Sequence, residues 1–233
     1  MLQLIGRRLI QLVPTVLIVS MLIFGLQQLL PGDPALVMAG EERDPQVIEQ
    51  IRQQYRLDQP IPVQYLAWLK GVATGDLGES MRLKEPVARL VAQKLPVTLQ
   101  LATMAMIIAM LIGVPAGVVS AVKKDSVWDY AVNALSLWGI STPNFWLGIM
   151  LIFLFAVQLG WLPASGYVSP FVDPVQSLKT TILPAFVLGN SIAGVLMRHT
   201  RAAMLQALNS DYVRTARAKG LFERRVVIGH AMR

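Results

Sequence analysis

The apolar run from Leu9 to Leu30 is the feature that most constrains this chain, because none of its residues carries a charge. As a helix, a run of this length covers the hydrocarbon core of a bilayer, which is about 30 Å thick. Arg7 and Arg8 precede it as they would in a signal peptide, but the run is too long and lacks an Ala-x-Ala cleavage pattern. We therefore expect a retained transmembrane helix.

Three further runs also lack charged residues, namely Pro96 to Val122, Tyr130 to Leu159 and Thr180 to Met197. Only 15% of the 233 residues are charged, whereas an average soluble domain has about 25%. The chain is thus predicted to be an all-α, polytopic membrane protein with four transmembrane helices. A proton-coupled carrier needs an ionisable group at membrane depth, and these runs offer none.

Small residues recur at every fourth position of the second run, at Ala105, Ala109, Gly113 and Gly117. This spacing places them on one stripe, which allows a second helix to approach closely. We interpret the stripe as a packing surface and not as a ligand site.

The third run is interrupted by the polar sequence Ser141, Thr142, Pro143 and Asn144. A proline at membrane depth frees a backbone carbonyl, which a hydroxyl group or water must then satisfy. Two interpretations remain open: a structural kink, or one wall of a polar translocation path.

The segment from residue 31 to 95 has the composition of an extramembrane module. Its residues Pro31 to Lys94 include eight Lys and Arg and nine Asp and Glu. Asp44 followed by Pro45 predicts a helix start, and a second short helix is expected from Val63 to Val72. The module is either a solvated cap over the helices or a surface that receives a delivery partner.

Basic residues mark one side of the membrane. Arg7 and Arg8 precede the first run, Lys123 and Lys124 follow the second, and a basic tail follows the fourth. The tail contains Arg198, Arg201, Arg214, Arg217, Lys219, Arg224, Arg225 and Arg233. The positive-inside rule makes this side the cytoplasm, so the N-terminus and residue 233 are cytoplasmic while residues 31–95 and 160–179 lie outside. Because these segments account for the net charge of +7, we expect no nucleic-acid partner.

Catalytic and metal-binding residues are not expected in this chain. It contains no cysteine, and its two histidines, His199 and His230, have no metal-ligand spacing. No Gly-x4-Gly-Lys-[Ser/Thr] loop is present to bind ATP phosphates. The chain is thus predicted to bind no cofactor, and any work it does must be driven by another chain.

A short basic segment in the tail is predicted to form an amphipathic helix. It comprises Asp211, Tyr212, Val213, Arg214, Thr215, Ala216, Arg217, Ala218, Lys219 and Gly220. Its apolar residues fall on one helical face, and its basic residues project elsewhere. Ser210 or Asp211 is expected to cap the helix start, and Gly220 to end the helix.

Several motifs together resemble the dipeptide, oligopeptide and nickel permease family of bacterial binding-protein-dependent ABC importers, which includes glutathione permeases. They are Leu30-Pro-Gly-Asp-Pro34, Tyr55-Arg-Leu-Asp-Gln-Pro60, Gly75-Asp-Leu-Gly78, Leu159-Gly-Trp-Leu-Pro163 and the segment 211–221. The resemblance implies the transmembrane domain of a type I ABC importer, of whose six expected helices four are present. Residues 1–30 would hold the cytoplasmic N-terminus and first helix, 31–95 a periplasmic module, 96–197 three helices, and 198–233 an incomplete cytoplasmic coupling loop.

The resemblance also implies a function and partners. The chain would be a permease subunit for peptides in the bacterial inner membrane, paired with a second permease subunit, two ATPase subunits that use ATP, and a periplasmic substrate-binding protein. The segment 211–220 would couple it to the ATPase, with Tyr212, Val213 and Ala216 entering a groove. Arg214 and Thr215 depart from the general importer signature, whereas Ala216 and Gly220 match it. The alternative is a membrane channel or scaffold in which the basic segment binds only anionic lipid.

Overall fold

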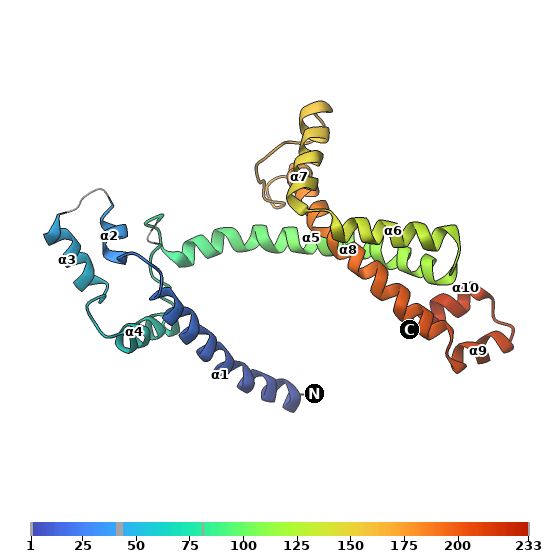
Figure 1. The fold of residues 1–233 in the computed structure, drawn as a ribbon, viewed down its shortest axis with the longest axis horizontal. Coiled ribbons are helices and arrows are strands. Elements are labelled where there is room, and N and C mark those ends of the chain that lie inside the picture. The colour runs from blue at the N-terminus through green and yellow to red at the C-terminus, as the bar shows by residue number, and fades with distance from the viewer. Residues whose placement is uncertain (1, 41–43, 81, 233) are drawn as a thin grey trace. The chain divides into compact units, whose positions relative to one another are not determined.

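The computed structural model describes residues 2–40, 44–80 and 82–232, and all named elements in this part are helices (Figure 1). Three of them are long and apolar enough to cross a membrane: α1 (Leu2–Gln27), α5 (Val87–Val122) and α8 (Pro174–Leu208). A fourth crossing is formed if α6 (Val127–Ser141) is taken together with the helix that follows it. The prediction of an all-α polytopic protein is confirmed.

The predicted third span is broken rather than continuous. After α6, a second helical segment consists of α7 (Asn144–Ile152) and the π-helix η1 (Phe153–Gln158). The two segments are bent by 97° at the break. Pro143 lies at this break, where its ring and missing N–H oppose helix continuation.

Two long helices extend beyond their apolar runs. α5 begins at Val87, before the expected Pro96, and α8 covers Pro174 to Leu208 instead of Thr180 to Met197. Asp173 caps α8, since its Oδ1 accepts a hydrogen bond from the Gln176 N–H at 2.9 Å. Part of the expected outer loop 160–179 is therefore helical, because the end of an apolar run marks a change of solvent and not a helix end.

The chain divides into two compact units, residues 1–93 and 94–233. Besides α1, the first unit contains α2 (Pro34–Ala39), α3 (Pro45–Gln54) and α4 (Ile61–Ala73). Asp33 and Asp44 cap α2 and α3 by accepting backbone N–H bonds at 2.9 Å, and a proline follows each of them. The predicted helix start at Asp44 is confirmed, and the second short helix is observed as α4.

An aromatic cluster joins α4 to α1 within the first unit. Phe24 of α1 lies 5.5 Å from Tyr65 and 6.1 Å from Trp68, measured between ring centroids. The Tyr65 hydroxyl also shares a hydrogen bond of 2.8 Å with the Ser20 hydroxyl. The hydroxyl of the buried Tyr65, which is its one polar side-chain atom, therefore has a hydrogen-bond partner.

In the second unit, α5 and α8 pack with their backbones in close approach. A Cβ atom on Gly117 would lie 2.6 Å from the Thr200 Cβ and 2.7 Å from the Met197 carbonyl oxygen. On α8, a Cβ atom on Gly189 would lie 2.8 Å from the Ala105 carbonyl oxygen. The stripe of small residues is therefore a helix-packing surface, as predicted.

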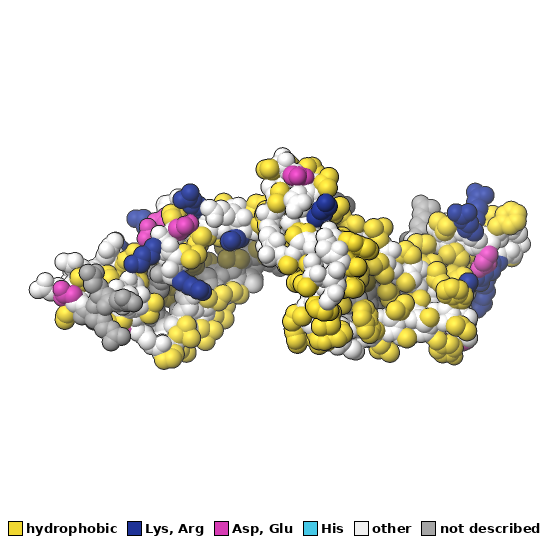
Figure 2. Space-filling view, turned by 90° about the horizontal axis from the view of Figure 1, so that it is seen from above, with side chains coloured by type: hydrophobic (Ala, Val, Ile, Leu, Met, Phe, Trp, Pro, Cys, Tyr) yellow, Lys and Arg dark blue, Asp and Glu magenta, His cyan; other side chains and the backbone are white. Residues whose placement is uncertain are grey.

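The same unit presents an apolar surface to its surroundings. In Figure 2, hydrophobic side chains cover much of the visible surface of its long helices, while Lys and Arg side chains gather at the end that carries α9 and α10. Such a surface suits a bilayer, in which apolar side chains meet lipid tails.

Candidate functional site

The amphipathic segment of the tail forms α9 (Asp211–Ala218), which follows α8 after a two-residue turn. Gly220 ends it as predicted: its φ of +75° lies in the left-handed region, and the Leu221 N–H reaches back to the Ala216 carbonyl at 3.4 Å. The predicted cap is not formed by Ser210, whose side chain makes no bond to α9. Its hydroxyl instead donates to the carbonyl of Ala207 at the end of α8, which also accepts the Ser210 N–H at 3.1 Å.

The apolar face of α9 is divided between the chain's own core and the exterior. Val213 is fully buried and Ala216 is 5% exposed, whereas Tyr212 is 53% exposed. The cluster that buries the first two is called the α9 core here. It consists of Ala121, Met204, Val213, Ala216, Val226, Val227 and Ala231.

The α9 core corrects one prediction from the sequence. Val213 and Ala216 pack against the ends of α5 and α8 and against α10 (Glu223–Val226) and η2 (Val227–Ala231), so they do not face a partner groove. The physical reason is that an amphipathic helix buries its apolar stripe against the nearest apolar surface, and this chain supplies one. Tyr212 remains the large apolar side chain that α9 leaves exposed.

The basic residues of α9 and Lys219 after it differ in the ion pairs that they form. Arg217 forms two bonds with Glu223, with N–O distances of 2.6 and 3.2 Å, which link α9 to α10. The Arg217 guanidinium lowers the pKa of Glu223, and the carboxylate raises the pKa of Arg217. Arg214 makes only an exposed contact of 3.3 Å with Asp211, and Lys219 makes no ion pair with any residue in the described ranges. Arg214 and Lys219 are therefore the basic groups most available on the exposed face.

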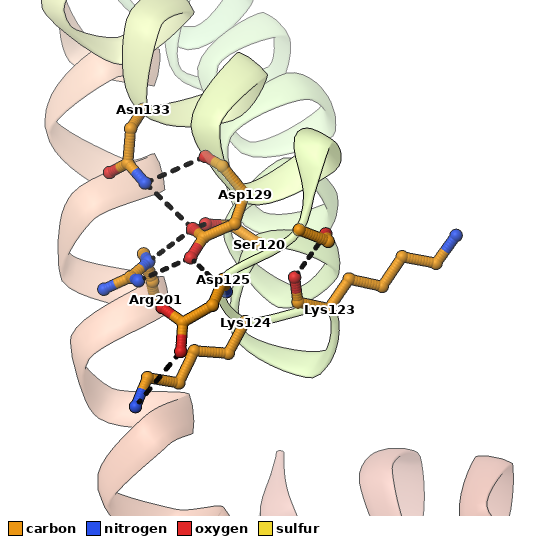
Figure 3. A network of polar contacts seen from close by, with 8 residues as sticks. Ser120, Lys123, Lys124, Asp125, Asp129, Asn133 and Arg201 are labelled. Atoms are coloured by element: carbon orange, nitrogen blue, oxygen red, sulfur yellow. Dashed lines mark hydrogen bonds and ion pairs between the residues drawn. The ribbon is translucent and has the colours of Figure 1, made fainter.

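A second constellation was missed by the sequence analysis and is centred on Asp129 (Figure 3). This residue lies in the first turn of α6 and is only 2% exposed. Its Oδ1 accepts from the Arg201 Nε at 2.7 Å and its Oδ2 from the Arg201 Nη2 at 2.7 Å. The two parallel bonds form the bidentate geometry that makes an arginine–carboxylate pair strong and directional.

Three further donors complete the coordination of this carboxylate. Oδ1 also accepts from the Ser120 hydroxyl at 2.5 Å and from the Asn133 amide at 2.8 Å, and Oδ2 accepts from the Asp125 N–H at 3.1 Å. We refer to Ser120, Asp125, Asp129, Asn133 and Arg201 as the Asp129 cluster. It connects α5, α6, α8 and the turn between α5 and α6, so one buried carboxylate holds three helices together.

Two signals in the sequence could have indicated the Asp129 cluster. Asp129 and Asn133 are four residues apart, which places them on the same face of a helix. Arg201 lies one helical turn after the end of the apolar run at Met197, so it is placed on a helix that continues out of the membrane. Neither signal identifies the other as its partner, because 72 residues separate Asp129 from Arg201.

The predicted path residues lie at the bend between α6 and α7. Thr142 is half-buried, and its hydroxyl donates at 2.7 Å to the Trp138 carbonyl, which also accepts the Thr142 N–H at 2.9 Å. Ser141, Pro143 and Asn144 are exposed. These contacts agree with the kink interpretation, and a role in lining a path stays a prediction. A groove of about 410 Å³ borders α6 and α8 and is lined by Asn133, Ile140, Val195, Arg198, His199, Arg201 and Ala202.

The fold and these sites define the class of the protein: a multi-pass helical membrane protein with a short surface helix anchored on the ends of its long helices. Among the residues that the structure describes, no group of three or more metal-ligating side chains occurs. Residues 113–233 match the family described as binding-protein-dependent transport system inner membrane component, and residues 1–102 match the N-terminal model of the same systems. The chain belongs to this family, and the predicted resemblance is confirmed.

Similar proteins occur in several bacteria. The chain is 46% identical over 231 residues to a putative peptide transport system permease protein of Brucella suis biovar 1, covering 99% of this chain and 73% of the relative. It is 43% identical to the di/tripeptide transport system permease protein DppB of Pseudomonas aeruginosa, covering 100% and 76%. It is 42% identical to the glutathione transport system permease protein GsiC of Escherichia coli K12, covering 100% and 74%.

Proposed function

We propose that this chain is the permease subunit of an ATP-driven importer that moves peptides, either di- and oligopeptides or glutathione-like ones, across the bacterial inner membrane. Its family and the names of its relatives support a transport subunit and this substrate class. A second permease subunit, two ATPase subunits and a periplasmic substrate-binding protein complete the proposed machine. ATP is bound by the ATPase subunits, and this chain contributes no catalytic residue.

The observation that carries the coupling role is the two-sided environment of α9. Its inner side is fixed in the α9 core by Val213 and Ala216, while Tyr212, Arg214 and Lys219 face outward. Because the core includes Ala121 of α5 and Met204 of α8, a force on the outer side of α9 acts on two membrane helices at once. We propose that the ATPase contacts this outer side and that α9 is the coupling helix.

The distribution of charge supports the proposed orientation. Basic residues gather in the turn after α5 and in the segment after the apolar part of α8, which favours a cytoplasmic location for both and for the N-terminus. We propose the same division of the chain as the sequence suggested. Residues 1–30 hold the N-terminus and first helix, and residues 31–95 form the periplasmic module. Residues 96–197 hold the further helices, and residues 198–233 form the coupling loop. Ser141, Thr142, Pro143 and Asn144 are proposed to border the path, because a bend of 97° presents backbone and polar side chains together.

The test uses the full-length permease with its ATPase and binding-protein partners in proteoliposomes. Tyr212→Ala and Lys219→Glu remove an exposed ring and reverse an exposed charge without entering the α9 core. We expect each to weaken copurification of the ATPase and to lower peptide uptake about 10-fold, as expected for an interface side chain worth about 1.4 kcal/mol. Tyr130→Ala, which removes another exposed tyrosine from α6, is the matched control.

Two results would contradict the proposal. One is wild-type ATPase recovery and uptake in both α9 variants. The other is a permease that purifies without an ATPase and whose attachment to anionic vesicles disappears at high salt, since this is the behaviour of a lipid-binding basic segment.

A further inference from the structure

The Asp129 cluster lies directly beside the α9 core along two helices. On α5, Ser120 of the cluster is adjacent to Ala121 of the core. On α8, Arg201 of the cluster lies one helical turn before Met204 of the core. The α9 core itself contains no residue of α6. At this end of the second unit, α6 is therefore tied to the α9 region through the carboxylate of Asp129.

Farther along, α6 contacts α8 by packing and by two hydrogen bonds between neutral groups. Val132 belongs to an apolar cluster with Ala109, Ala193 and Met197. The Ser136 hydroxyl donates to the Gly194 carbonyl at 2.8 Å, and the Asn190 amide donates to the Gly139 carbonyl at 3.4 Å. Apolar contacts have little directional preference and single neutral hydrogen bonds are weaker than charged ones, so helices packed in this way can shift against each other by small sliding movements. A bidentate ion pair opposes such a shift, because both of its bonds weaken when the donors leave the carboxylate plane.

The far end of α6 leads to the bend at Ser141 and Asn144. A displacement of α8 that α6 follows in fixed register therefore reaches this bend as a whole-helix movement. If α6 does not follow α8, the two helices slide past each other and α6 does not transmit the movement to the bend. The Asp129 cluster opposes sliding of α6 along α8 at the end of these helices where α9 is anchored.

We infer that Asp129 and Arg201 are positioning residues for transport, which keep α6 in register with α8 so that movement of α9 reaches the bend between α6 and α7. This inference rests on the proposed coupling role of α9. The Asp129 carboxylate is buried and bound by protein donors, so the expected effect of the pair is on the efficiency with which hydrolysis is converted into uptake.

The experiment measures ATP hydrolysis and peptide uptake together in proteoliposomes that hold the complete importer. Asp129→Asn keeps the side-chain shape and removes the charge that Arg201 binds. We expect the ATP hydrolysed per peptide imported to rise about 10-fold, within the roughly 2-fold to 30-fold range in which residues between two sites change their coupling. The matched control is Asp33→Asn, which removes the charge from another Asp–Arg pair, in the first unit.

Arg201→Lys is the second variant, and it keeps the test decisive if Asp129→Asn does not assemble. Lysine preserves the positive charge opposite Asp129 but cannot form two parallel bonds. We expect the same direction of change with a smaller size, at ATPase recovery equal to that of the wild type. If uptake and hydrolysis fall in equal proportion in both variants, or in whichever of them assembles, the cluster only stabilises the fold and the inference is wrong.

Failure of this inference is distinguishable from failure of the proposed function. If α9 couples but the Asp129 cluster does not position α6, Tyr212→Ala reduces ATPase recovery while Arg201→Lys leaves the hydrolysis-to-uptake ratio at its wild-type value. If α9 does not couple, Tyr212→Ala leaves ATPase recovery unchanged, which overturns both.

Discussion

Two Asp–Arg pairs, one in each unit, have nearly the same bond length but different surroundings. The Arg52 Nη2 to Asp33 Oδ2 distance is 2.5 Å, and the Arg201 Nη2 to Asp129 Oδ2 distance is 2.7 Å. The side chain of Asp33 is 30% exposed and that of Asp129 is 3% exposed. Water competes for the first carboxylate, whereas the second depends entirely on protein donors.

This difference determines what each pair does for the fold. Exposed ion pairs contribute about 0–1 kcal/mol, because water solvates the separated charges almost as well. A buried pair gives a modest net gain, but removing one partner costs about 3–5 kcal/mol since an uncompensated charge stays behind. Asp33 and Arg52 therefore join α2 to α3 by a bond whose loss costs little stability. Removal of either Asp129 or Arg201 destabilises the fold, because the other charge then lacks its partner.

The largest expected effect comes from leaving Asp129 without its cation. Arg201→Met is expected to lower the free energy of unfolding by about 3–5 kcal/mol, because the buried carboxylate loses its two charged donors. Unfolding of the detergent-solubilised protein, followed by circular dichroism, measures the change. Arg198→Met serves as the control, as Arg198 is an exposed residue on the same helix. If the two variants were equally stable, burial of Asp129 would not make its ion pair more important for stability than the exposed pair of Asp33 and Arg52.

The second prediction tests the close packing of α5 against α8 in the second unit. Gly117→Ala is expected to cost about 1–3 kcal/mol, because the new methyl group overlaps the Thr200 side chain and the Met197 carbonyl. Gly148→Ala on α7 is a matched control, since its methyl group would lie 3.9 Å from the nearest atom, the Cγ2 of Val187. The same unfolding measurement applies, and a Gly117→Ala protein as stable as the control would show that α5 and α8 separate easily.

The third prediction addresses the exposed pair directly. Asp33→Asn removes the charge that Arg52 binds, but asparagine still accepts the Ala35 N–H and caps α2. The expected loss of stability is therefore only a small fraction of that expected for Arg201→Met. A loss as large as that of Arg201→Met would equate the two pairs and overturn the comparison.

The smallest expected effect concerns the exposed pair between α9 and α10. The hydrogen bond from Arg217 lowers the pKa of Glu223 below its ordinary value of 4.5. A lowered pKa means that the pair contributes fully above about pH 4.5 and is lost as the pH falls through the lower, folded-state pKa. Carbon-13 NMR titration of the Glu223 carboxylate checks the direction of this shift. Arg217→Gln should move the midpoint of the Glu223 titration upward. An unchanged midpoint would show that the pair does not form in solution.

Local sequence determined much of what could be predicted. Asp44 and Pro45 specify a helix start through their own backbone preferences, and Gly220 specifies a helix end in the same way. The stripe containing Gly113 and Gly117 predicted a packing surface because helical periodicity fixes which residues share a face. Each of these predictions needs no knowledge of distant residues.

The remaining features depend on contacts between distant parts of the chain. Periodicity placed Val213 and Ala216 on one face of α9 but could not say whether a partner or the chain itself covers them. The sequence shows Asp129 only as a charged residue just before an apolar run, because its burial arises when Arg201 of α8 packs against α6. The residues proposed to act in coupling are thus those whose surroundings depend on tertiary structure.

The close approach of α5 and α8 also has an evolutionary consequence. At Gly113, Gly117 and Gly189 an added Cβ atom would meet a backbone carbonyl oxygen at 2.7 to 2.9 Å, and no substitution of the facing residue removes that oxygen. Positions 113, 117 and 189 should therefore remain glycine across related permeases for as long as the two helices keep this spacing.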